Sequence, residues 1–304
     1  MPMSKTYASE RGELFSAGDV FAGRYRMITC INRGGRGDVW HADDLLLSTP
    51  VALKLIRSAS ASTRARVNQE VRLSRRITHP AVCRVFDIGE EGETMFFSME
   101  LVGGSTLAAL LKRTGRLAPE RVLRIAHQLC SALTAAHRQG VLHGDLTPSN
   151  VLIDQAGQLR IIGFGKSGSV NHTGERTIGT RGHLAPEQLA SGVSLSECTD
   201  IHAVGAILYE LVTGRRPDSS TESNGEAVSP SRLVRGIGLR LERAILKALS
   251  LNLKDRPPTA LALAAELPPI ADASGSAPVR RSSPSARWAV WRLQAAAVSA
   301  LLAW

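Results

Sequence analysis

Short apolar stretches of strand length dominate the first third of the chain. The stretch 19–40 contains two such runs about a glycine-rich turn, and further runs at 51–56, 82–89 and 94–101 are bounded by charged or glycine-containing turns. One segment between them, 61–77, has helical character. This pattern predicts a small sheet that carries a single helix.

Helical periodicity replaces the strand pattern after residue 118. The segment 118–140 has a proline near its first turn and repeats apolar residues at helical spacing, namely Val122, Ile125, Leu129, Leu133 and Ala136. The segment 200–214 is apolar on nearly all sides, which indicates a buried helix. Further helices are expected at 231–251 and 260–266. Together with the amino-terminal strands, these helices predict an α+β fold.

Composition allows a substantial core and argues against nucleic-acid binding. The chain has 304 residues, is 43% hydrophobic and carries a net charge of +10. Part of that charge is an arginine cluster, formed by Arg57, Arg64, Arg66, Arg72, Arg75 and Arg76. Such a cluster can meet phosphate-rich or acidic partners. Because no aromatic residues interleave it, a solvated helix face is the favoured interpretation, and no nucleic-acid partner is expected.

Cysteine spacing and the amino-terminus bear on the compartment. The four cysteines, Cys30, Cys83, Cys130 and Cys198, form no CxxC pair and have no histidine at metal spacing, so neither disulfides nor a zinc site is expected. The segment 4–13 is polar and charged and lacks the apolar core of a signal peptide. We therefore expect a cytoplasmic protein.

The glycine-rich turn is a candidate phosphate site. Gly34 and Gly37 have no Cβ, so their backbone amides can approach an anionic ligand, and Val39 would lie against an adenine face. Asn32 stands where the usual glycine-loop pattern begins with glycine, but asparagine tolerates positive φ. An ordinary glycine hairpin is the alternative.

A lysine interrupts the next apolar strand. Lys54 shares its face with Ala52, and Glu70 in the following helix could pair with it and aim its ammonium at phosphates. The alternative is a lysine that extends from a strand edge into water. Its position after a glycine hairpin favours the functional interpretation.

These features, with Glu70 ahead of His79 and Pro80, resemble the N-terminal lobe of bacterial eukaryotic-like serine/threonine protein kinases. The resemblance implies a two-lobed domain over 19–268, with an N-lobe at about 19–101 and a C-lobe at about 104–268, and ATP and Mg²⁺ as ligands. The residues that it assigns to nucleotide binding are Ile31, Gly34, Gly37, Val39, Ala52, Lys54, Glu70, Met99, Glu100, Val102 and Leu152.

The stretch 141–153 resembles the kinase catalytic loop H-R-D-x-x-x-x-N. The resemblance implies that Asp145 accepts or orients the proton of a substrate hydroxyl and that Asn150 binds the metal. Gly144 stands where many kinases have an arginine that pairs with a phosphorylated activation loop. Thr147 stands where a lysine usually steadies the transferred phosphate, which removes a positive charge from the transition state but leaves a hydroxyl donor.

The turn Gly163-Phe164-Gly165 resembles the kinase Asp-Phe-Gly motif with its aspartate missing. In the family that aspartate chelates the magnesium that bridges the β- and γ-phosphates, and no carboxylate lies within 161–166. Losing it should weaken magnesium binding and slow phosphotransfer by roughly a hundredfold or more. Phe164 can still pack beneath the helix that carries Glu70.

The segment that follows contains two more features of the resemblance. Candidate phosphorylation sites lie at Ser169, Thr173 and Thr177, and Glu187 is implied to form a buried ion pair with Arg256. His183 stands where the family commonly has tyrosine, and we expect a surface or groove-lining histidine there.

The chain ends differ from the domain in composition. Residues 1–18 form a tail, and 269–287 is a linker rich in Ala, Ser, Pro and Arg. The apolar segment 288–304 would reach about 25 Å as a helix, short of a hydrocarbon core of roughly 30 Å. A truncated membrane span, an interfacial amphipathic helix and a disordered tail are the alternatives, and membrane contact through this segment is an expectation.

The resulting functional hypothesis is a signalling pseudokinase that binds ATP, with weak or lost phosphotransfer caused by Gly163, and with a protein substrate or signalling partner. An active serine/threonine kinase is the first alternative, because Lys54, Glu70, Asp145 and Asn150 are intact. A membrane-tethered interaction protein without nucleotide binding is the second.

Overall fold

The computed structural model describes residues 15–34, 37–57, 60–165, 183–190, 194–217 and 226–270. The chain divides into two compact units, Met1–Pro268 and Pro269–Trp304. Almost all of the second unit lies outside the described residues, as do the three expected phosphorylation sites and the segment 288–304. Every helix and strand that the structure describes belongs to the first unit.

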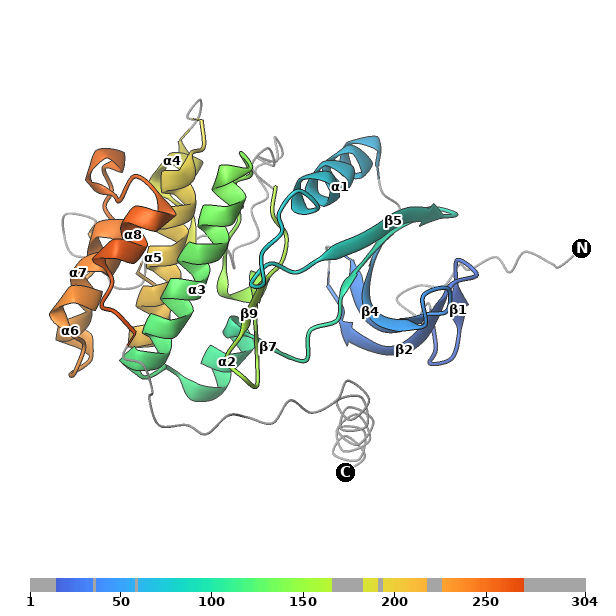
Figure 1. The fold of residues 1–304 in the computed structure, drawn as a ribbon, viewed down its shortest axis with the longest axis horizontal. Coiled ribbons are helices and arrows are strands. Elements are labelled where there is room, and N and C mark those ends of the chain that lie inside the picture. The colour runs from blue at the N-terminus through green and yellow to red at the C-terminus, as the bar shows by residue number, and fades with distance from the viewer. Residues whose placement is uncertain are drawn as a thin grey trace, which may run out of the picture. The chain divides into compact units, whose positions relative to one another are not determined.

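The amino-terminal strands form one antiparallel six-stranded sheet in the order β1-β2-β3-β4-β6-β5 (Figure 1). Its strands are β1 (Val20–Phe21), β2 (Tyr25–Asn32), β3 (Asp38–Asp44), β4 (Thr49–Ile56), β5 (Val85–Glu91) and β6 (Thr94–Glu100). Adjacent strands in sequence pair through tight turns, except that β4 pairs with β6. The connection between β4 and β5 contains the helix, so the sheet with one helix is confirmed.

That helix, α1 (Ala61–Ser74), begins where Ser60 Oγ accepts the Thr63 backbone N–H at 3.2 Å. It ends earlier than the expected residue 77. Arg76 and Ile77 instead form backbone turns onto Leu73 and Ser74. The chain then enters His79-Pro80, where the residue before proline is biased away from helical backbone angles.

The remainder of the unit is mainly helical, which confirms the α+β class. Its longer helices are α2 (Leu107–Thr114), α3 (Pro119–Arg138), α5 (Glu197–Thr213), α7 (Leu239–Ala248) and α8 (Ala260–Glu266). Shorter turns of helix are η1 (Pro148–Asn150), α4 (Pro186–Leu189), α6 (Pro230–Leu233) and η4 (Leu253–Asp255). The single helix expected at 231–251 is wrong. It divides into α6 and α7 because Gly236 adopts φ +85° between them, a backbone angle that few other residues adopt.

A small second sheet was not expected from the pattern. It has the order β7-β8-β9 and consists of β7 (Gly104–Thr106), β8 (Val151–Asp154) and β9 (Leu159–Ile161). These strands are too short for a periodicity to be visible. In the chain, the segment 141–150 leads directly into β8, and the turn at 163–165 follows closely after β9.

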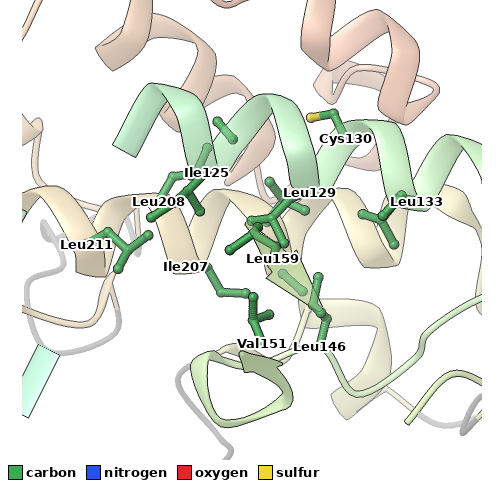
Figure 2. Close-up of a cluster of buried hydrophobic side chains, with 14 of the residues drawn as sticks. Ile125, Leu129, Cys130, Leu133, Leu146, Val151, Leu159, Ile207, Leu208 and Leu211 are labelled. Carbon is green, nitrogen blue, oxygen red and sulfur yellow. The ribbon is translucent and has the colours of Figure 1, made fainter. Parts of the chain in front are cut away.

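The core of the helical part lies between α3 and α5. Figure 2 shows Ile125 of α3 beside Leu208 of α5, and Leu129, Leu133 and Ile207 as members of the same buried cluster. All five side chains have no more than 1% of their surface exposed. Burying each stabilises the fold by about 1.5–3 kcal/mol relative to an exposed side chain. Val151 and Leu159 of the small sheet join the same cluster, which ties that sheet to the helices.

An ion pair between Glu187 and Arg256 is buried, as expected. Arg256 donates from Nη1 and Nη2 to the two carboxylate oxygens at 2.8 and 3.0 Å, and Thr199 Oγ1 donates to Oε1 at 3.0 Å. Burial acts to raise the pKa of Glu187, but the hydrogen bonds from Arg256 and Thr199 outweigh it and hold that pKa below its ordinary value.

Candidate functional site

A cavity of about 330 Å³ lies between the large sheet with α1 and the small sheet. Seven of the residues expected to bind nucleotide or metal line it, namely Gly34, Gly37, Val39, Lys54, Glu70, Met99 and Asn150. Gly163 and Phe164 line it as well. The structure thus brings the glycine turn, the lysine strand and the x-Phe-Gly turn, which are far apart in the sequence, to one cavity.

The other expected nucleotide-binding residues do not line this cavity. They are Ile31, Ala52, Glu100, Val102 and Leu152. Ala52 is 5% exposed and faces Met99 across the β4–β6 pair, so it packs in the sheet core. Ile31 is 48% exposed near the end of β2. The nucleotide-binding role of these five residues stays a prediction.

Gly37 has the clearest steric reason to be glycine at the site. It has φ +110°, and a Cβ placed on it would lie 2.2 Å from the carbonyl oxygen of Leu55. Any side chain would therefore force β3 away from β4. Glycine keeps the turn closely packed on the strand that carries Lys54.

The expected ion pair between Lys54 and Glu70 is not formed. Both side chains line the cavity, yet none of the ion pairs between described residues joins them. Lys54 Nζ instead lies 5.3 Å from the ring centroid of Phe97, which stands directly opposite it across the β4–β6 pair. A cation over an aromatic face is stabilised by about 0.5–1 kcal/mol at exposed sites, which is comparable to the stabilisation from a solvated ion pair. Because the two energies are similar, the β4–β6 strand register, which places Phe97 opposite Lys54, decides which contact the lysine makes.

The loop 141–150 is held in place by a buried carboxylate of α5. Asp200 of α5 is 1% exposed and accepts the backbone N–H groups of His143 and Gly144 at 2.8 and 2.9 Å. His137 Nε2 donates to the same carboxylate at 2.9 Å. Sequence reasoning placed Asp200 only as the start of a helix; α5 begins at Glu197. The overlooked signal is an acidic residue within an otherwise apolar helix.

Asn150 is oriented by its own loop. Its Nδ2 donates to the backbone oxygen of Asp145 at 2.7 Å, and its backbone N–H donates to the backbone oxygen of Thr147 at 3.0 Å. With the amide nitrogen engaged, Oδ1 is the atom available to a ligand in the cavity. Asp145 and Thr147 line a smaller neighbouring hollow. The two candidate catalytic residues and Asn150 are therefore joined by backbone contacts in one loop.

The Gly163-Phe164-Gly165 turn keeps an ordered geometry without its aspartate. Gly163 has φ +81°. His143 Nε2 donates to the carbonyl of Ile162 at 3.0 Å, and its ring lies 4.9 Å from that of Phe164. Phe164 is 1% exposed, and its backbone oxygen accepts from Ser74 Oγ of α1 at 3.4 Å. The expected packing of Phe164 against this helix is observed.

The end of β6 is joined to β9 by an ion pair. Arg160 Nε donates to Glu100 Oε1 at 2.9 Å, and both side chains are about a quarter exposed. The Glu100 carbonyl accepts from Cys83 Sγ at 3.6 Å. Burial raises the pKa of the Cys83 thiol to about 12, so this cysteine is a thiol and not a nucleophilic thiolate.

His183 is buried and not on the surface. Only 6% of its side chain is exposed, and its Nε2 lies 2.7 Å from Glu210 Oε2. It lines the small hollow beside Asp145, which agrees with the groove-lining alternative. The carboxylate on α5 explains the burial, because it supplies the partner that a buried imidazole requires.

The site residues fit a divalent cation only in part. No group of three or more His, Cys, Asp or Glu residues that could hold a metal occurs among the described residues. The cavity offers the Asn150 amide oxygen and, from α1, the Glu70 carboxylate. Magnesium is commonly held by one or two carboxylates together with substrate phosphates, so this donor set suits an ion that arrives with a nucleotide.

A glycine-turn sheet and a helical body that share one cavity, with an Asp–Asn loop beside an x-Phe-Gly turn, define the protein-kinase class. The protein kinase domain family matches residues 25–255, and the chain belongs to that family. The expected family and fold are thereby confirmed.

Curated bacterial relatives bear serine/threonine-kinase names. The chain is 38% identical over 213 residues to serine/threonine-protein kinase PknA of Mycobacterium tuberculosis, covering 66% of this chain and 49% of that protein. It is 31% identical over 272 residues to PrkC of Bacillus subtilis, covering 84% and 42%, and 36% identical over 276 residues to pkn3 of Myxococcus xanthus, covering 82% and 50%. The chain thus spans about half the length of these relatives.

Within the described part of the chain, no helix has the length and apolar character needed to cross a membrane.

Proposed function

We propose that this chain is a nucleotide-responsive pseudokinase that binds ATP and has weak or lost phosphotransfer. The observation that carries the proposal is Gly163, which lines the cavity at the position where the family places its metal-binding aspartate. The related kinases and the family membership support ATP as the ligand. A protein substrate or signalling partner is part of the proposal.

Binding is supported by the walls of the cavity. Gly34 and Gly37 offer backbone close to a phosphate, Val39 and Met99 offer apolar surface to a base, and Lys54 offers a positive charge between them. These groups act on the nucleotide whether or not a metal accompanies it.

Transfer is weakened because charge compensation is incomplete. Bound Mg²⁺ neutralises phosphate charge and orients the phosphates. Asp145 would orient a substrate hydroxyl, and Thr147 supplies a hydroxyl donor where a lysine charge is usual. With Gly163 also neutral, the loop and the turn present one carboxylate, Asp145, where the family presents two. Placement of the hydroxyl is retained while stabilisation of the developing charge is reduced.

The test is ATP binding measured separately from ATP turnover. A thermal shift with ATP, in EDTA and in Mg²⁺, reports binding, and transfer of labelled phosphate to the protein or to a generic substrate reports turnover. We expect a shift in both media and little transfer. Transfer at ordinary kinase rates that Asp145→Asn abolishes would overturn the proposal.

An active kinase is the second candidate, favoured by the ordered loop in which Asn150 donates to the backbone of Asp145 at 2.7 Å. It predicts that Gly163→Asp changes turnover little. A gain of roughly a hundredfold from that substitution would reject this candidate and support the pseudokinase.

A further inference from the structure

Glu70 is the only carboxylate among the described residues that line the cavity. It projects from α1, whereas Asn150 and Gly163 come from the loop and turn of the small sheet. A cation in this cavity would therefore find its one anionic protein ligand on α1 and not on the turn that carries it in the family.

The face of α1 that carries Glu70 is the face turned to the defective motif. Glu70 and Ser74 are four residues apart and so lie on the same side of the helix, and both line the cavity. Ser74 Oγ donates to the Phe164 carbonyl at 3.4 Å, directly after Gly163. One turn of helix thus separates the Glu70 position from a contact with the motif.

Close approach of α1 to the motif is allowed by the glycine after Phe164. A Cβ on Gly165 would lie 2.9 Å from a side-chain carbon of Leu73. A side chain at 165 would press on Leu73 of α1 and force that side chain to shift, so glycine favours close packing of the helix on the turn.

Glu70 is also not committed to Lys54, since the two form no ion pair and Lys54 Nζ lies over Phe97. The Glu70 carboxylate is therefore available to a second ligand in the cavity. Asn150 completes the set with its Oδ1, because its amide nitrogen is held by Asp145.

We propose that Glu70 supplies the carboxylate of a divalent-cation site, with Asn150 as the neutral ligand and ATP phosphates as the remaining ligands. This inference rests on the proposed ATP binding. Magnesium keeps several of its waters when bound, so Glu70 serves either directly or through one water. In this proposal, Glu70 of α1 supplies the carboxylate ligand that position 163 lacks.

The test compares ATP affinity in Mg²⁺ with affinity in EDTA, by calorimetric titration of the full chain. We call the ratio of the two affinities the magnesium ratio. The wild type should have a ratio above one. Glu70→Gln should lower that ratio by about tenfold, the scale on which ligand-shell substitutions weaken metal sites, and leave the EDTA affinity unchanged. Glu70→Asp, which keeps the charge, should recover part of the ratio.

Two controls make the outcome specific. Glu93→Gln removes an exposed glutamate in the β5–β6 turn and should leave both affinities as in the wild type. Gly163→Asp restores a carboxylate to the motif, and in that background Glu70→Gln should no longer lower the magnesium ratio.

The outcomes separate this inference from the proposed function. If Glu70→Gln weakens ATP binding equally in EDTA and in Mg²⁺, the glutamate acts through Lys54 and the inference is overturned. A wild-type ratio of one, or a ratio that survives Glu70→Gln, overturns it as well. Absence of ATP binding in both media rejects the proposed function itself. Melting temperatures of the variants, measured without nucleotide, show that each remains folded.

Discussion

Arg256 binds Glu187 with two hydrogen bonds, and the side chains are 0% and 5% exposed. Arg256 also donates to the backbone oxygens of Cys198 and Ser250 at 3.0 and 2.8 Å. One guanidinium thus connects α4, the start of α5 and the approach to η4.

Removing one partner of this pair should cost more than an ordinary surface change. Arg256→Ala leaves the Glu187 carboxylate buried without its counter-charge, and we expect it to lower the free energy of unfolding by about 3–5 kcal/mol. Arg243→Ala, on the exposed side of α7, is the matched control and should change it by less than about 0.5 kcal/mol. Urea unfolding followed by circular dichroism measures both. Equal effects from the two substitutions would contradict the structural role of the pair.

Asp200 should prove as sensitive, for a different reason. Its carboxylate accepts two backbone N–H groups and the His137 imidazole N–H, so Asp200→Ala leaves three buried or partly buried donors without this acceptor. We expect a loss of about 3 kcal/mol or more in unfolding free energy, since bonds to a charged acceptor contribute roughly 1.5–3 kcal/mol each. Asp255→Ala, at an exposed aspartate of η4, is the control. Hydrogen exchange should become faster at the His143 and Gly144 amides in Asp200→Ala only. Unchanged protection there would show that the loop is held by other contacts.

His202 predicts a specific acid sensitivity. Burial, and secondarily the charge of Arg256, lower its pKa to about 4, while Glu187 acts in the opposite direction and His183 adds to the lowering. In the unfolded chain the His202 imidazole binds a proton at about pH 6.5, whereas in the fold it stays neutral down to about pH 4. The free energy of unfolding therefore decreases progressively as pH falls from about 6.5 to about 4. The loss over that range is about 3 kcal/mol.

The check is a pH series of urea unfolding. His202→Gln should remove this contribution, so the wild type should lose stability more steeply than the variant between pH 6.5 and 4. Above pH 7 the difference between the two should be constant. Parallel curves throughout the range would mean that the imidazole is not held neutral in the fold.

The positive φ of Gly163 should make alanine more destabilising than aspartate at this position. At φ +81°, Gly163→Ala should cost about 1–2 kcal/mol of unfolding free energy, whereas Gly163→Asp should cost less because aspartate visits positive φ more readily. Gly238→Ala provides the control, since that glycine has ordinary φ and open space around it. Thermal unfolding measures the series. A more damaging aspartate than alanine would indicate that the cavity repels a negative charge at this position.

Local pattern was sufficient for much of the fold and part of the site. The strand runs, the helices at 118–140 and 260–266, and the motif order around Lys54, Asp145 and Asn150 could be read because each depends on spacing within a short segment. The split of α6 from α7 could not, since apolar periodicity continues across a break that a glycine backbone angle creates. The β7-β8-β9 sheet escaped detection because its strands have only three or four residues, too few to show a periodicity, and because β7 pairs with a strand that is distant in sequence.

By itself, the sequence determined that a carboxylate is missing at Gly163, because the residue type alone tells which chemical groups a position carries. Only the tertiary structure decided what surrounds that gap. Which charges meet depends on strand register and helix face: register sets Lys54 beside Phe97, and the α1 face sets Glu70 and Ser74 toward the turn. Likewise, Asp200 becomes the anchor of the loop because α5 packs against α3 and places a buried carboxylate where it accepts the backbone N–H groups of His143 and Gly144. These relations join residues that lie far apart in the chain, where spacing carries no information about contact.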